Sequence, residues 1–144
     1  MLVSEILRIK GNALYTTPSD ALAVDAVKIM VDLDIGSLVV MDEGRMTGIV
    51  TFAEMLMALA ERGGSLGDTL ISDIVVRNPP TADPHISIME LRGMMLEHHA
   101  RYVPVMEGHT LLGVVSLHDV AKAVYEEQSF ENQMLKSYIQ DSPA

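Results

Sequence analysis

The chain has 144 residues, of which 20 are acidic and 10 are Lys or Arg, so its net charge is −10. This acidity argues against nucleic acid or anionic lipid as a partner, because both are bound by basic surfaces. Hydrophobic residues make up 49% of the chain, which is too apolar for a disordered protein. No apolar run approaches the roughly 20 residues of a membrane span, no secretory signal is visible, and the sequence has no cysteine. A cytoplasmic protein without disulfides is therefore expected.

The first half of the chain is predicted to alternate strands and helices, beginning with a strand at Thr16. Apolar residues then recur at helical spacing over 23–33, and Gly36 is expected to end this helix. The apolar segments within 37–50 surround a polar turn and predict a hairpin. Thr51 is expected to begin a second helix, which stops at a pair of glycines.

The second half repeats this order of elements at a constant offset. Gly48-Ile49-Val50-Thr51 recurs as Gly113-Val114-Val115-Ser116, which is an offset of 65 positions, and the same offset aligns Met30 with Met95. Internal similarity of this kind indicates a duplicated small domain. We therefore expect a first repeat with an N-terminal arm, a second repeat and a tail, at residues 1–64, 65–128 and 129–144.

Two kinds of segment lie outside the repeated unit. A short echo precedes each copy, since residues 3–7 resemble residues 71–75. The tail is predicted to form an amphipathic helix capped by Ser129. Its apolar residues are Phe130, Met134, Leu135, Tyr138 and Ile139. This helix either covers the protein's own core or contacts a second copy, and the sequence favours neither alternative.

Catalytic and metal-binding motifs are not found in the sequence. The five histidines lack the spacing typical of a metal site, so we expect them at the surface. No glycine-rich dinucleotide motif, nucleophile elbow or carboxylate dyad is present. We therefore predict no catalytic residue, no metal and no required cofactor, which leaves an enzyme and a metal-binding module as remote alternatives.

Two motifs of the form Gly-h-h-(Thr/Ser)-x-x-(Asp/Glu), where h is apolar, follow the two predicted hairpins at 48–54 and 113–119. With these motifs in register, the chain resembles a pair of cystathionine-β-synthase (CBS) domains, the Bateman module, over Leu2–Tyr125. The tail is similar to that of small bacterial stand-alone CBS-pair proteins. The resemblance implies an α/β (α+β) fold of two tandem βαββα repeats packed with pseudo-two-fold symmetry.

The same resemblance implies a function. Modules of this type bind adenosine-containing ligands such as AMP, ADP, ATP, NAD or S-adenosylmethionine in clefts between the repeats, commonly form homodimers, and regulate rather than catalyse. Physically, a strand-to-helix turn leaves backbone N–H groups for a phosphate, and a carboxylate one turn further on can accept ribose hydroxyls. We therefore expect a regulatory or sensor protein that binds an adenosyl ligand as a homodimer, with a protein partner that the sequence does not name.

The second repeat is expected to hold the stronger site. Arg101 suits a phosphate because its guanidinium stays charged and bonds two oxygens at once. Pro104 within a strand suggests an open edge, where hydrogen bonds from a ligand could fall. The candidate ligand-binding residues are Thr81, Arg101, Tyr102, Val103, Pro104, Ser116, His118 and Asp119.

The first repeat is expected to hold a weaker or empty site. Gly36 takes the place of Arg101 there, and Glu54 is one methylene longer than an aspartate. The candidate residues are Thr16, Ser37, Leu38, Thr51 and Glu54. Both hydroxyl–acid pairs also have the spacing of helix capping boxes, which need no ligand. A ligand-free dimerisation or scaffold protein with degenerate sites is therefore the alternative function.

Overall fold

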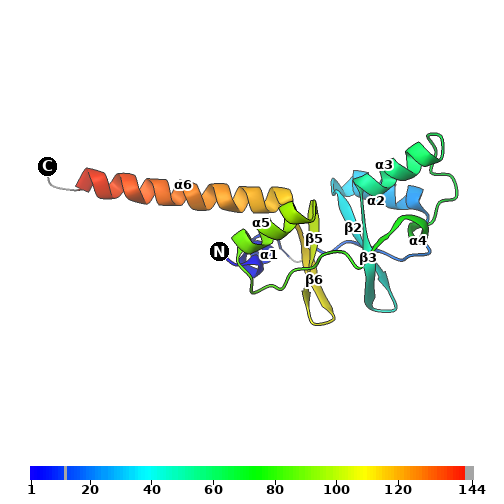
Figure 1. Ribbon diagram of the computed structural model, residues 1–144, viewed down its shortest axis with the longest axis horizontal. Helices are drawn as coiled ribbons and strands as arrows, with labels where there is room; N and C mark the ends of the chain where they lie inside the picture. Colours follow the sequence, from blue (N-terminus) through cyan, green and yellow to red (C-terminus); the bar gives the residue numbers. More distant parts are fainter. Residues whose placement is uncertain (12, 142–144) are drawn as a thin grey trace.

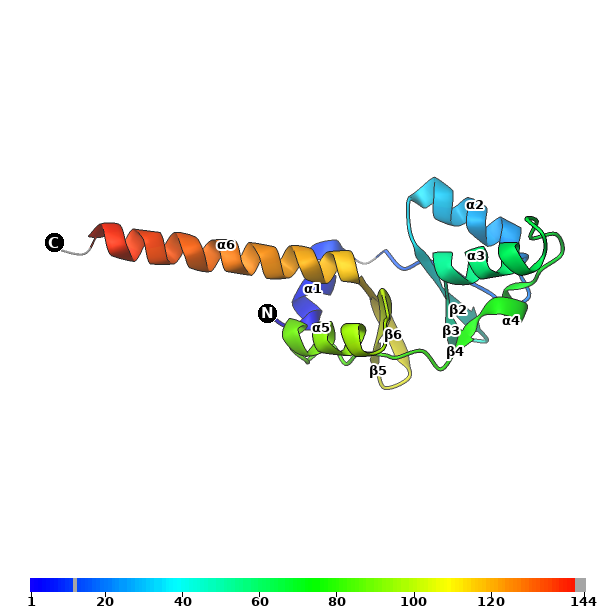
Figure 2. The same cartoon turned by 45° about the horizontal axis from the view of Figure 1, so that its top comes forward.

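The structure is a computed structural model that describes residues 1–11 and 13–141. Its elements are α1 (Val3–Lys10), β1 (Thr16–Thr17), α2 (Ala23–Leu33), β2 (Ser37–Asp42), β3 (Arg45–Thr51), α3 (Phe52–Glu61), α4 (Ile71–Ile74), β4 (Val76–Arg77), α5 (Ile88–Glu97), β5 (Tyr102–Glu107), β6 (Thr110–Ser116) and α6 (Leu117–Asp141). Figures 1 and 2 show two lobes, with both hairpins in the middle, α2, α3 and α4 on one side, and α1, α5 and α6 on the other. The predicted α/β fold is confirmed.

The two lobes pair their strands in the same register. In the first lobe β1 runs parallel to β2, and β2 pairs antiparallel with β3 so that Leu38 lies opposite Val50. In the second lobe Val103 lies opposite Val115, which preserves the offset of 65 positions. A bridge between Ala82 and Val105 takes the place of the β1–β2 pairing. The two halves that are similar in sequence therefore also have the same pattern of hydrogen bonds between their strands.

The hydrophobic cores of the lobes exchange their first helices. Val3 and Ile6 of α1 belong to the core of the second lobe, together with residues of α5, β5, β6 and α6. Ile71 of α4 belongs to the core of the first lobe. The boundaries at 64/65 and 128/129 stay predictions. Each hydrophobic core contains residues from before and from after the 64/65 boundary.

The motif glycines make room for the exchanged segments. A Cβ on Gly48 would lie 2.1 Å from the Val76 carbonyl oxygen, in the strand that follows α4. A Cβ on Gly113 would lie 2.9 Å from a methyl group of Leu7 on α1. Both glycines therefore stand where another segment packs directly against the hairpin.

The predicted end of α2 is wrong by two residues. The helix ends at Leu33, and Asp34, with φ of 53°, takes the left-handed conformation that we assigned to Gly36. Short polar side chains tolerate this conformation. Gly36 has a different role, because a Cβ there would lie 1.7 Å from the Tyr102 hydroxyl oxygen. It lets a side chain of the second lobe pack against the first.

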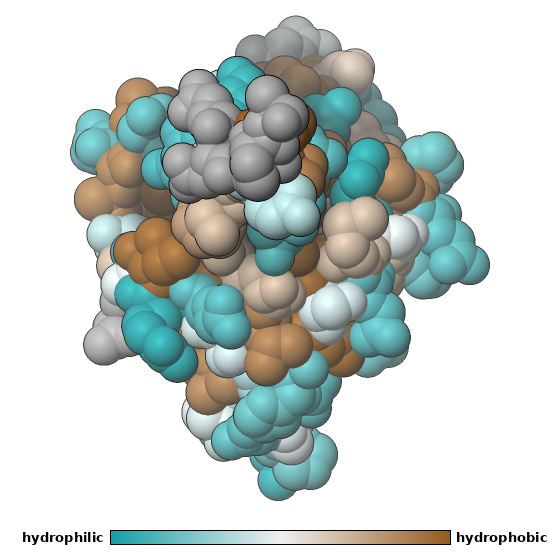
Figure 3. All heavy atoms as spheres, turned by 90° about the vertical axis from the view of Figure 1, so that its left-hand side faces the viewer, coloured by the Kyte–Doolittle hydropathy of each residue, from teal (hydrophilic) through white to brown (hydrophobic). Residues whose placement is uncertain are grey.

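The predicted start of a separate tail helix at Ser129 is also wrong, because α6 is one helix of 25 residues and Ser129 lies inside it. The distal part of α6 projects beyond the body (Figure 1), and Figure 3 views the molecule from that side, with apolar and polar side chains intermixed at the surface. The five apolar tail side chains are 58% to 75% exposed, so they do not cover the protein's own core. Within the described ranges, no helix is both long and apolar enough to cross a membrane.

Candidate functional site

A cavity of about 550 Å³ opens between the two lobes. Its walls come from the end of α1 and the segment after it, from the turn between α2 and β2, and from β5, β6 and the start of α6. The lining residues include Lys10, Leu14, Tyr15, Asp34, Ile35, Gly36, Ser37, Arg101, Tyr102, Val114, Ser116, His118 and Asp119. This volume is typical of small-molecule sites, and the lining combines aromatic and aliphatic groups with a few charged ones.

A capping box builds the polar end of the cavity. The Ser116 amide donates to Asp119 Oδ2 at 2.8 Å, and the Asp119 amide donates to Ser116 Oγ at 3.0 Å. The Leu117 amide donates to the Arg101 carbonyl at 2.8 Å. Most of the N–H groups that we expected to be free for a phosphate are therefore already bonded within the protein.

The Asp119 carboxylate is also paired with a lysine from the other end of the chain. Lys10 Nζ lies 2.8 Å from Asp119 Oδ2 and donates to the Val114 carbonyl at 2.9 Å. Burial opposes ionisation of Asp119, but the hydrogen bonds from Lys10 and from the Ser116 amide hold its pKa below the ordinary value. Asp119 is thus an ionised acceptor at neutral pH.

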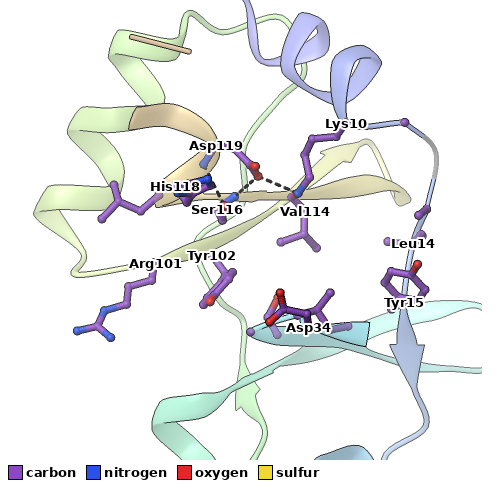
Figure 4. Close-up of a pocket in the computed structure, with 16 residues that line it drawn as sticks. Lys10, Leu14, Tyr15, Asp34, Arg101, Tyr102, Val114, Ser116, His118 and Asp119 are labelled. Carbon is purple, nitrogen blue, oxygen red and sulfur yellow. Dashed lines mark hydrogen bonds and ion pairs between the residues drawn. The ribbon is translucent and has the colours of Figure 1, made fainter. Parts of the chain in front are cut away.

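Arg101 lines the cavity, but its guanidinium does not join this pair. Figure 4 shows the Arg101 side chain directed away from Asp119 and Lys10, while Tyr102 points into the space between the lobes. Arg101 is exposed, whereas Tyr102 is partly buried. The cation beside the carboxylate is therefore Lys10, a residue that the sequence analysis did not identify.

The structure brings together six of the residues singled out in the sequence. Five come from the stronger set and one from the weaker set: Arg101, Tyr102, Ser116, His118, Asp119 and Ser37. Of the weaker set, Ser37 thus lines the same cavity as five residues of the stronger set.

The other predicted residues do not line this cavity. Leu38 and Val103 are fully buried in the two cores. Pro104 does not leave an open edge, because its carbonyl accepts from the Ala82 amide at 3.0 Å and that segment runs beside it. Thr81 is exposed and directly precedes Ala82 in the chain.

The remaining candidates of the first repeat have structural partners. Thr16 pairs with Val39 in the sheet. Thr51 and Glu54 form a reciprocal cap, in which the Thr51 amide donates to Glu54 Oε1 at 2.7 Å and the Ala53 amide donates to Thr51 Oγ1 at 3.2 Å. These contacts match the capping interpretation of the motif.

Among the described residues, no group of three or more His, Cys, Asp or Glu side chains could hold a metal ion. The cavity also has little net charge of its own. Lys10 and Arg101 are balanced by Asp34 and Asp119, and the nearest ammonium and carboxylate already pair with each other. The cavity can therefore bind a polar small molecule through hydrogen bonds with the paired Lys10 and Asp119 side chains and through apolar contacts with its walls.

Two repeated units with this topology define a class of protein, and comparison with known families identifies it. The chain matches the CBS domain family over residues 3–61 and 71–126, so it belongs to that family and contains a pair of the domains. It is 30% identical to the mitochondrial CBS domain-containing protein CBSX3 of Arabidopsis thaliana, over 96% of this chain and 71% of that protein.

Solved structures show the same fold. A protein with CBS domains from Burkholderia ambifaria MC40-6 superposes with a TM-score of 0.83 at 30% identity, covering 89% of this chain and 96% of that one. The CBS domain pair of protein MJ0100, in complex with 5′-methylthioadenosine and S-adenosylmethionine, gives a TM-score of 0.79 at 26% identity, covering 88% of this chain and 98% of that one. The fold is thus one in which a related domain pair holds adenosyl ligands.

Proposed function

We propose that this protein is a regulatory module that binds an adenosine-containing ligand in the cavity between its two lobes and performs no catalysis. The observation that supports this most directly is the cavity itself, which gathers Tyr102, Ser116 and Asp119 of the second repeat beside Ser37 of the first. The related domain pair of protein MJ0100 forms a complex with adenosyl ligands. In this proposal Asp119 accepts ribose hydroxyls, Tyr102 lies against the base, and Arg101 turns inward to meet a phosphate where the ligand has one.

Regulation would follow from the position of the cavity. Its walls belong to both lobes, so a ligand that contacts both favours one relative arrangement of the lobes over others. A protein partner, in turn, recognises that arrangement. A cytoplasmic location and a homodimer are part of the same proposal and stay predictions.

The test is isothermal titration calorimetry with AMP, ATP, NAD and S-adenosylmethionine on the wild type and on Asp119→Ala. We expect at least one ligand to bind the wild type and the variant to bind it more than tenfold more weakly, because a charged hydrogen-bond acceptor is lost. Asp73→Ala is the matched control, because Asp73 also caps a helix, by accepting from the Leu70 amide at 2.9 Å, and also lies near a basic side chain, that of Arg62, but is outside the cavity. A wild type that binds none of the four ligands contradicts the proposal.

A ligand-free scaffold remains the alternative, and one observation favours it. Both hydroxyl–acid pairs cap their helices in the structure. On this alternative Ser116→Ala lowers the melting temperature, as loss of a cap worth about 1 kcal/mol should, and no nucleotide raises it in the wild type. A ligand-dependent rise in the wild type's melting temperature rules the scaffold out.

A further inference from the structure

The Lys10–Asp119 pair leaves one donor and one acceptor available. An ammonium group has three N–H donors, and Lys10 Nζ uses two of them, toward Asp119 Oδ2 and the Val114 carbonyl. Oδ2 of Asp119 is shared by Lys10 and the Ser116 amide. Within the described residues no protein group donates to Oδ1 of Asp119. The pair therefore combines an unused N–H and an unused carboxylate oxygen.

The unused carboxylate oxygen is accessible. Among the described residues, no buried side-chain nitrogen or oxygen lacks a hydrogen-bond partner. Because Oδ1 has no such partner, it is not sealed inside the protein. Lys10 and Asp119 both line the cavity between the lobes (Figure 4), and the Asp119 side chain is 17% exposed. A molecule in this cavity can thus reach both members of the pair.

We propose that Lys10 and Asp119 together recognise the vicinal hydroxyls of the ligand's ribose, with Asp119 Oδ1 accepting from one hydroxyl and Lys10 Nζ donating to the oxygen of the other. This inference rests on the proposed function and makes α1 part of the binding site. A vicinal diol is complementary to an adjacent donor and acceptor, because each hydroxyl can both donate and accept. Lys10 is then a specificity-determining residue.

A contact of Lys10 with phosphate is the competing role, and the geometry favours it less. A phosphate that accepted from the unused N–H of Lys10 would lie close to the Asp119 carboxylate, which is 2.8 Å from the same nitrogen and repels a second anion. Lys10 and Asp119 also line a second, smaller cavity of about 150 Å³.

The test compares adenosine with 2′-deoxyadenosine and 3′-deoxyadenosine by calorimetry, on the full chain. We expect the wild type to bind adenosine about tenfold more tightly than either deoxynucleoside, because each lacks one hydrogen bond to a charged group. Lys10→Met is expected to weaken adenosine binding and to reduce one of the two discrimination ratios to below about twofold. Lys10→Arg, which keeps a charged donor, is expected to retain part of both ratios.

Lys28→Met is the control, because Lys28 lies exposed on α2 and does not line the cavity. If Lys10→Met fails to fold, as judged by its thermal melt, Lys10→Gln takes its place in the same comparison. Unchanged discrimination in a folded Lys10 variant overturns this inference and leaves the proposed function standing. Weaker AMP binding with unchanged adenosine binding also overturns it, in favour of phosphate contact. A wild type that binds no adenosyl compound overturns both proposals.

Discussion

Asp119 is a residue on which both the local structure and the candidate site depend. It caps α6 through the Ser116 amide, pairs with Lys10 and faces the cavity. The sequence motif identified the cap and the carboxylate, because both belong to one short segment. It could not identify Lys10, which lies 109 positions away from Asp119 and has no motif of its own. The contact exists only because the core exchange brings the end of α1 to β6 and α6.

The lowered pKa of Asp119 predicts a specific loss of stability in acid. Its ionised form has better partners in the folded chain, so the contribution is complete above the ordinary value of 3.8 and is lost as the pH falls through the lower folded pKa. We expect Asp119→Asn to melt roughly 2–4 °C below the wild type at pH 7, which corresponds to about 1 kcal/mol for a partly exposed ion pair. This difference should shrink toward zero well below pH 3.8.

Thermal melts of the two proteins from pH 7 to pH 2.5 measure this difference directly. Asp42, whose pKa is also lowered, by Thr47 and Ser19, is present in both proteins, so its acid titration cancels in the comparison. A gap in melting temperature that stays constant down to the lowest pH would show that Asp119 stabilises the fold without its charge.

At the scale of elements, the hairpins were predictable and the helix exchange was not. Two hairpins and four of the helices follow from apolar periodicity and turn residues, which act locally. The echo between 3–7 and 71–75, for which no secondary structure was predicted, corresponds to two short helices, α1 and α4. Nothing in the residue pattern of either segment states which lobe it completes. In the structure Gly113 leaves room for Leu7 of α1, and Gly48 leaves room for Val75 and Val76, which directly follow α4.

These two glycines should respond differently to the same substitution. In Gly48→Ala the new methyl group meets a backbone oxygen at 2.1 Å, and backbone in a paired strand cannot move alone. In Gly113→Ala it meets only the methyl end of Leu7 at 2.9 Å, which can change rotamer. We expect Gly48→Ala to cost about 2–3 kcal/mol of unfolding free energy and Gly113→Ala less than about 1 kcal/mol.

Urea denaturation of both variants against the wild type gives these values, provided the slopes of the three curves agree. In a chain that already carries Leu7→Ala, Gly113→Ala should lower the unfolding free energy by even less than it does in the wild type. Equal costs at the two positions would mean that the exchanged segments are not packed as the structure has them.

At the scale of the whole molecule, apolar side chains remain on the outer helices of both lobes. Leu56 on α3 is 66% exposed and Met134 on α6 is 58% exposed. Extended apolar patches are uncommon on monomeric proteins. In a homodimer, a second copy of the chain would cover these side chains. The exposure of the apolar tail side chains agrees with the remaining alternative for the tail, contact with a second copy of the chain. That contact stays a prediction.

We expect light scattering coupled to gel filtration to give about twice the chain mass of 15.7 kDa. Leu56→Glu and Met134→Glu should shift this mass toward that of one chain, because each places a charge in the apolar contact. Ile9→Glu, at a position that is 70% exposed on α1, should leave it unchanged. A wild type that elutes with the mass of a single chain would contradict the homodimer.

The exchange of α1 and α4 has a consequence for how the chain could be divided. A cut between Gly63 and Gly64, in the segment that joins the repeats, would leave one fragment with a helix foreign to its own sheet and lacking the helix its core requires. The other fragment would be in the same position. Neither piece could hide its apolar interior alone, yet together they hold every part, so the two are expected to reassemble into a nicked copy of the intact fold.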